Sequence, residues 1–164
     1  MNKPLTVLFL CTHNSARSIL AEALLTRLGN GRFAAYSAGS SPRDSGKPNP
    51  LTVQVLEEAG FATADLRSKS WDEFILPGAP VIDVVITVCG AAEETCPVFP
   101  GHPATAHWGF EDPSAGDASD AVKLAAFRAT LLQISQRMEL LVSLPDASLQ
   151  RLVLEQTVRD LAAR

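Results

Sequence analysis

The sequence predicts an α/β fold built around a doubly wound parallel sheet, on the strength of two apolar runs and one change of period. Residues 5–10 are apolar without alternation, which is typical of a strand buried on both faces of a parallel sheet. Residues 81–88 form the strongest β-branched run in the chain and indicate a central strand. From Ser18 the apolar residues recur at helical spacing. Strands that alternate with helices in one domain are joined by right-handed crossovers and are therefore parallel.

Local signals predict the remaining elements. Gly29 can end the first helix, and Asn49 with Pro50 can begin the second one as cap and first helical residue. Pro145 cannot continue a helix and closes the longest one. In chain order we expect a helix over about 18–29, a strand over 33–38, a helix over about 49–60, the strand over 81–88, a short strand near 104–107, a helix over about 119–144 and a last helix over about 148–163.

Composition and charge exclude several classes of protein. The 164 residues are 46% hydrophobic and 20% charged, without low-complexity tracts or repeats, which predicts a single globular domain. The net charge of −4 gives no general attraction for nucleic acid or for an anionic membrane surface. We see no basic leader and no apolar run of membrane-spanning length. The number of cysteines, three, is odd, so they cannot all pair within the chain. We therefore expect a cytoplasmic protein with reduced or catalytic thiols rather than a disulfide framework.

The first strand leads into a loop that is suited to an oxyanion. The loop reads Cys11, Thr12, His13, Asn14, Ser15, Ala16, Arg17 and Ser18. Its backbone N–H groups, the N-terminus of the following helix and the guanidinium of Arg17 all favour an anion. The same groups stabilise a thiolate on Cys11, which makes it a nucleophile, while Asn14 suits unusual dihedrals and Ser18 can donate to the sulfur. Cys89 also ends a strand, and ligands of such sheets bind beyond the carboxyl ends of strands, so we expect both thiols at one crevice.

The Cys-x5-Arg-Ser pattern resembles the low-molecular-weight protein tyrosine phosphatase superfamily, in which it follows the first strand and a later Asp-Pro pair supplies a general acid. Asp112 and Pro113 fit this pair, and the resemblance runs from about residue 5 to residue 143. It implies a three-layer sandwich with a four-stranded parallel sheet and flavodoxin-like winding. It also implies that Cys11 is the nucleophile, that Arg17 binds the anion and that Asp112 donates a proton.

Within this superfamily the chain is more similar to the arsenate reductases than to the phosphatases. Cys89 and Cys96 resemble their pair of resolving cysteines. Residues 106–114, which read Ala-His-Trp-Gly-Phe-Glu-Asp-Pro-Ser, resemble their His-Trp-Gly-Phe-Asp-Asp-Pro segment. Ser114 also stands where tyrosine phosphatases usually carry an aromatic residue that stacks on the substrate ring. The similarity to the reductases therefore involves several separate segments.

The resemblance implies that arsenate is reduced to arsenite. The Cys11 thiolate would attack arsenic while Asp112 protonates the departing oxygen. Cys89 would then attack the sulfur of Cys11 and release arsenite, and Cys96 would form a disulfide with Cys89. Such a disulfide needs Cα atoms within about 7 Å, so we expect residues 89–97 to rearrange. The partners implied are arsenate, with phosphate or sulfate as mimics, and thioredoxin or glutaredoxin with glutathione as reductant; no tightly bound cofactor is implied.

The chain departs from the reductases at two loop positions and at its C-terminus. His13 stands where thioredoxin-coupled members commonly have Gly, and Ala16 where several have Cys. We interpret His13 as a loop residue that faces solvent. The chain also extends beyond the end of the shorter reductases. We therefore expect a phosphatase-like reductase domain over 1–144 and a C-terminal helical extension of the same domain over 145–164.

Other interpretations stay open. A phosphomonoester phosphatase would need Cys11, Arg17 and Asp112 but has no use for two further cysteines, and a degenerate fold would serve as a non-enzymatic oxyanion-binding module. A zinc site would combine the three cysteines with His13, His102 or His107, although Cys-x2-Cys spacing is absent. Finally, the resemblance implies a site for a monovalent cation such as potassium at Asn14, Glu22, Ser37 and Asp72.

Overall fold

The computed structural model describes residues 3–89, 99 and 104–151 of the chain. Strands and helices alternate along it, as the sequence predicts, and one short 3-10 helix was not expected. The elements are, in order, β1 (Leu5–Cys11), α1 (Arg17–Leu28), β2 (Phe33–Gly39), α2 (Pro50–Glu58), the 3-10 helix η1 (Trp71–Phe74), β3 (Val84–Thr87), β4 (Ala104–His107) and α3 (Asp120–Val142).

Four parallel strands form one sheet in the order β2-β1-β3-β4. This confirms the predicted α/β class and the four-stranded sheet with flavodoxin-like winding. In the register of the sheet, Cys11 of β1 pairs with Gly39 of β2, and Leu10 pairs with Thr87 of β3. The carboxyl ends of β2, β1 and β3 therefore meet at one edge of the sheet, where such folds bind their ligands.

β3 is shorter than the strand predicted over 81–88. The backbone N–H of Asp83 donates to the carbonyl of Thr6, and its carboxylate accepts the N–H of Thr6 at 2.8 Å. Val81, two residues before Asp83, is 75% exposed. The β-branched run therefore begins outside the sheet, and regular pairing starts only at Val84.

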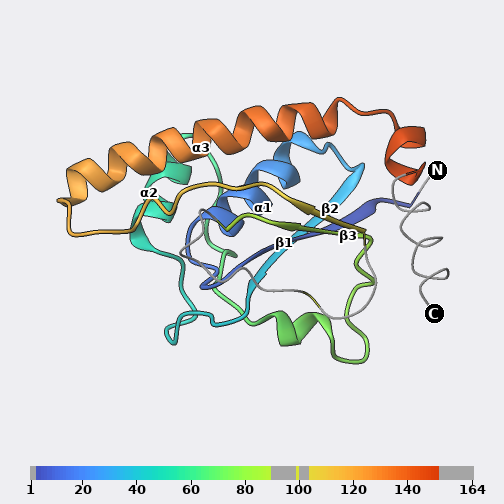
Figure 1. Ribbon diagram of the computed structural model, residues 1–164, viewed down its shortest axis with the longest axis horizontal. Coiled ribbons are helices and arrows are strands. Elements are labelled where there is room, and N and C mark those ends of the chain that lie inside the picture. The colour runs from blue at the N-terminus through green and yellow to red at the C-terminus, as the bar shows by residue number, and fades with distance from the viewer. Residues whose placement is uncertain (1–2, 90–98, 100–103, 152–164) are drawn as a thin grey trace.

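Helices cover one face of the sheet and η1 lies against the other, which gives the three expected layers (Figure 1). Successive strand residues point to opposite faces. Val7 and Phe9 of β1 lie in the larger core, together with buried residues of α1, α2 and α3. Leu8 and Leu10 lie in the smaller core, against which Trp71 and Phe74 of η1 pack. β1 is therefore buried on both faces, as its uninterrupted apolar run predicts.

The helix ends agree closely with their sequence signals. Asn49 caps α2, since its side chain accepts the Leu51 N–H at 2.9 Å, and Ser119 caps α3 in the same way. Residues 146–151 are helical, and the rest of the helix predicted over 148–163 lies outside the described residues. No helix in the described part of the chain is long and apolar enough to cross a bilayer.

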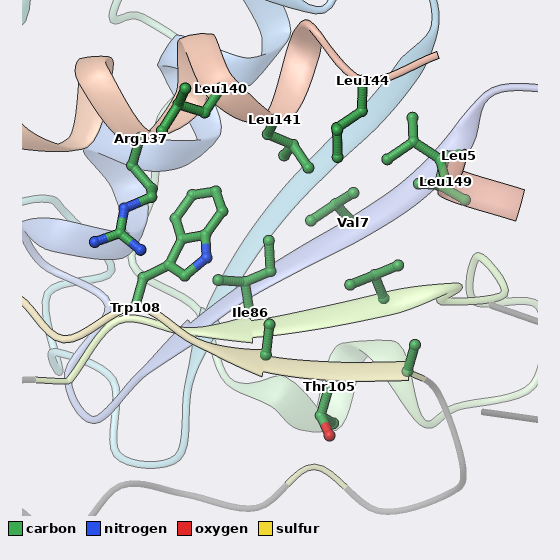
Figure 2. Close-up of a pocket in the computed structure, with 13 residues that line it drawn as sticks. Leu5, Val7, Ile86, Thr105, Trp108, Arg137, Leu140, Leu141, Leu144 and Leu149 are labelled. Carbon is green, nitrogen blue, oxygen red and sulfur yellow. The ribbon is translucent and has the colours of Figure 1, made fainter. Parts of the chain in front are cut away.

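An apolar groove of about 400 Å³ lies between the C-terminal part of α3 and the sheet (Figure 2). Val7 and Ile86 form its floor, Leu141 and Leu144 its opposite wall, and Arg137 reaches over the ring of Trp108 at one end. None of residues 11–18 lines the groove. It is therefore separate from the loop that follows β1.

Candidate active site

The Cys11 thiol lies at the carboxyl end of β1, where the chain turns into α1. The residue is only 3% exposed. Its Sγ atom lies 2.9 Å from the hydroxyl oxygen of Ser18 and accepts the backbone N–H of Asn14 at 3.3 Å. Ser18 belongs to the first turn of α1. Two donors and a helix N-terminus are therefore directed at the sulfur.

Asn14 determines the shape of the loop. It is fully buried and has a φ of 48°, in the left-handed region that Asn tolerates better than most residues. Its side-chain carbonyl accepts the backbone N–H of Lys69 at 2.9 Å, and its amide donates to Ser18 Oγ at 2.8 Å. Because the Ser18 oxygen accepts from Asn14, its own proton is available for Cys11 Sγ. Asn14 therefore has the unusual dihedrals for which its residue type is suited.

The loop between Cys11 and Arg17 packs against the end of β2 and against α2. Gly39 ends β2 against it, and a Cβ atom at that position would lie 2.5 Å from the carbonyl oxygen of Thr12. Ser41 donates its backbone N–H to the same carbonyl at 2.8 Å, and Thr52 donates its hydroxyl to Ser15 O at 2.7 Å. His13 is exposed, as expected, and its ring contacts the carbonyl of Ser41. The loop backbone is therefore fixed by contacts with β2 and α2.

Arg17 and Asp112 meet beside the loop. The guanidinium of Arg17 donates to the carbonyl of Phe110 at 2.9 Å, and it lies 3.9 Å from Asp112 Oδ2. The Arg17 side chain is 6% exposed and that of Asp112 is 29% exposed. The other oxygen of Asp112 accepts both the N–H and the hydroxyl of Ser114. The oxygen that lies toward Arg17 is therefore the one that Ser114 does not contact.

Cys89 follows the end of β3, the strand that pairs with β1. It is fully buried in the same apolar core as Cys11. The backbone N–H of Val88 donates to the carbonyl of Leu10 at 3.0 Å, so the pairing of the two strands continues to the residue just before Cys89. The structure thus places both cysteines at the carboxyl ends of adjacent strands, as predicted. Cys96 lies outside the described residues.

Three of the four residues expected to hold a monovalent cation lie around one buried lysine. Glu22 accepts the hydroxyl of Ser37 at 3.1 Å and lies 3.7 Å from Lys69 Nζ, and Asn14 accepts the Lys69 N–H. Asp72, in η1, is exposed. Burial raises the pKa of Glu22, and the nearby Lys69 ammonium opposes this shift.

The described residues also bear on the zinc interpretation. Within residues 3–89, 99 and 104–151, no three His, Cys, Asp or Glu side chains are grouped so as to hold a metal ion. His107 instead contacts the hydroxyl of Thr87 at 2.7 Å. Cys96 and His102 of that interpretation lie outside the described residues.

Two contacts of this site were not predicted from the sequence, that of Lys69 with Asn14 and that of Ser114 with Asp112. Lys69 lies in a polar connection without periodicity, so its contact with Asn14, 55 positions earlier, has no local signal. The contact of Ser114 could have been predicted. When Ser stands two residues after Asp, the Asp side chain often accepts a hydrogen bond from the later residue in a turn.

Comparison with known proteins agrees with this geometry. Residues 6–155 match the model of the family described as low molecular weight phosphotyrosine protein phosphatase. The chain belongs to this family. Its relatives include an arsenate reductase of Halalkalibacterium halodurans, which is 34% identical over 139 residues that make up 85% of this chain and 95% of the relative.

Solved structures of arsenate reductases also resemble the chain. An arsenate reductase from Archaeoglobus fulgidus is 30% identical, with a TM-score of 0.68 over 84% of this chain and 99% of its own. A thioredoxin-dependent arsenate reductase from Corynebacterium glutamicum is 26% identical, with a TM-score of 0.53 over 85% of this chain and 65% of its own. The fold implied by the sequence resemblance is confirmed.

We predict that Gly39→Ala weakens both the fold and the binding of inorganic phosphate. The added methyl group would meet two backbone atoms of the loop, Thr12 O at 2.5 Å and Asn14 N at 3.0 Å, and neither can move without reshaping the loop. Overpacking of this kind costs about 1–3 kcal/mol of unfolding free energy. Denaturant unfolding and calorimetric titration with phosphate measure the two effects. Ser40→Ala, at the exposed neighbouring position, is the control, and parent-like values for Gly39→Ala in both assays would contradict the prediction.

Proposed function

We propose that this protein reduces arsenate to arsenite through Cys11, Cys89 and Cys96. The observation that carries the proposal is the position of Cys89, at the carboxyl end of the strand that pairs with the one ending on Cys11. A phosphatase uses Cys11, Arg17 and Asp112 and gains nothing from a second cysteine there. The relatives of this chain and the solved structures similar to it are named arsenate reductases, which supports the same choice.

The first step is attack by the Cys11 thiolate on arsenic. The loop amides and the Arg17 guanidinium are suited to bind arsenate, since it has nearly the shape and charge of phosphate. A bond forms between Cys11 Sγ and arsenic, and an arsenic–oxygen bond breaks. Asp112 supplies a proton to the departing oxygen, which leaves as water. Its position 3.9 Å from Arg17 supports this role, because a group bound to the guanidinium would lie beside the carboxyl group.

The second step transfers the electrons. The Cys89 thiolate attacks the sulfur of Cys11, so that a disulfide forms while the sulfur–arsenic bond breaks. The electron pair of the broken bond stays on arsenic, which is reduced from As(V) to As(III) and leaves as arsenite. Cys96 then attacks the sulfur of Cys89 and expels Cys11 as a thiolate. Because Cys89 is fully buried, we infer that the chain around it moves during this exchange.

Thioredoxin is the reductant that we propose for the resulting Cys89–Cys96 disulfide. A dithiol reductant regenerates both thiols by one further exchange, and its own oxidation balances the electrons given to arsenic. The thioredoxin dependence of the C. glutamicum reductase supports this choice. The alternative, glutaredoxin with glutathione, is separated from it by supplying each reducing system alone in an assay of arsenate-dependent NADPH oxidation.

We predict that Asp112→Asn slows the first chemical step by roughly 10²–10⁴-fold, because the amide cannot donate the proton that the leaving oxygen needs. Phosphate binding should persist, since Arg17 and the loop are unchanged. The measurement is the single-turnover rate of arsenite formation. Glu111→Gln, at the exposed adjacent position, should keep the parent rate. An unchanged rate in Asp112→Asn would show that another group donates the proton.

We predict different endpoints for the two resolving cysteines. Cys89→Ser should stop at the arsenic adduct on Cys11, because a hydroxyl group cannot perform thiol exchange. Cys96→Ser should pass one step further and accumulate a Cys11–Cys89 disulfide. Peptide mapping after one exposure to arsenate, with thiols blocked in acid, identifies each product, and Cys11→Ser should form neither.

Two results would contradict this relay. Sustained arsenate reduction by both Cys89→Ser and Cys96→Ser, with thioredoxin as the only reductant, would remove these residues from the reaction. Hydrolysis of a generic phosphomonoester by both variants at the parent rate, without any disulfide formed on arsenate exposure, would instead identify a phosphatase.

A further inference from the structure

The contacts of Lys69 test whether the residues expected to bind a monovalent cation fit such an ion. Lys69 Nζ lies 3.7 Å from Glu22 Oε1, and the two side chains are only 7% and 15% exposed. An ammonium at this distance already neutralises the carboxylate and would repel a second cation. Asn14 directs its carbonyl at the Lys69 N–H, and Asp72 is exposed. These residues therefore do not fit a bound potassium ion.

The groups around the ammonium are those that would otherwise suit a small cation. Lys69 Nζ donates to the backbone carbonyl of Arg67 at 3.1 Å, and Glu22 accepts the hydroxyl of Ser37 at 3.1 Å. Carboxylate and carbonyl oxygens are the ligands that hard cations prefer. Lys69 thus brings a covalently attached positive charge into a pocket of oxygen atoms.

Burial makes the Glu22–Lys69 pair mutually dependent. Burial is the main influence on both groups: it raises the pKa of Glu22 and lowers the pKa of Lys69. Each partner opposes the shift of the other, because its charge favours the ionised form across the pair. Removing only the ammonium would leave a buried carboxylate without its nearest positive charge, which is costly.

Lys69 is also connected to the sulfur of Cys11 through its backbone. Its N–H donates to Asn14 Oδ1, Asn14 donates to Ser18 Oγ, and Ser18 lies 2.9 Å from Cys11 Sγ. Its carbonyl accepts the N–H of Gly39, which ends β2 against the same loop. A side chain that fixes the backbone of residue 69 therefore also fixes the position of Asn14.

We propose that the Lys69 ammonium replaces a bound monovalent cation in this protein, so that it neutralises Glu22 and holds residue 69 against the oxyanion loop. Lys69 is then a positioning residue that acts through Asn14. This proposal depends on the proposed function in one respect only, namely that the oxyanion loop is part of the active site. Its test by thermal unfolding requires no arsenate reduction, so either proposal can fail without the other.

The experiment compares thermal unfolding in potassium chloride and in choline chloride at equal ionic strength. The parent protein should unfold at the same temperature in both salts. In Lys69→Ala, the space left by the side chain exposes Glu22 and the Arg67 carbonyl to solution cations. Potassium should then raise the unfolding temperature of the variant by roughly 3–6 °C over choline.

Two further variants identify the cause. The double variant Lys69→Ala with Glu22→Gln should lose the potassium response, because the buried negative charge that attracts the ion is gone. Arg128→Ala removes an exposed ion pair with Glu58 at 2.9 Å and should, like the parent, not respond to potassium. Within the proposed function, potassium should also restore the rate of arsenate reduction in Lys69→Ala and leave the parent rate unchanged.

Two outcomes would overturn the proposal. The first is stabilisation of the parent by potassium over choline, which would show that the protein binds the ion despite Lys69. The second is a folded Lys69→Ala that does not respond to potassium. If Lys69→Ala does not fold in either salt, the unfolding temperature of the parent protein is the test. Equal temperatures in potassium and choline support the proposal, and a higher temperature in potassium overturns it.

Discussion

The left-handed backbone of Asn14 is the constraint on which the candidate site depends. With a φ of 48°, this residue turns its own N–H toward Cys11 Sγ and places its side chain between Lys69 and Ser18. The turn leaves almost no space behind it, because Gly39 is packed against the loop backbone. The sulfur therefore receives its donors from a preformed loop, which avoids the cost of ordering those groups when an anion binds.

The parallel sheet adds the second constraint. Because every strand runs in the same direction, the segments after β1, β3 and β4 all leave the sheet at one edge. The first carries Cys11 and Arg17, the second Cys89, and the third Asp112. The carbonyl of Phe110 holds Arg17 and thereby ties the third segment to the first. Arg17 and Asp112, which are far apart in the sequence, thus come to lie 3.9 Å from each other.

The sequence was most informative where a local pattern has a local cause. The buried strand before Cys11, the cap at Asn49 and the loop ending at Arg17 follow from periodicity and residue chemistry, and the structure agrees with each. The exact start of β3 and the role of Lys69 were not predictable. The first depends on Thr6 pairing with Asp83, and the second on a contact between Lys69 and Asn14. Tertiary contacts of this kind leave no periodic signal.

In the proposed reaction, the electrons for arsenate come from thiols of this chain. The most direct measurement uses the fully reduced parent protein, freed of external reductant, exposed once to excess arsenate and analysed for arsenite and for remaining thiols. We expect about one arsenite to be released per chain and two of the three thiols to be lost. Retention of all three thiols with no arsenite formed would contradict it.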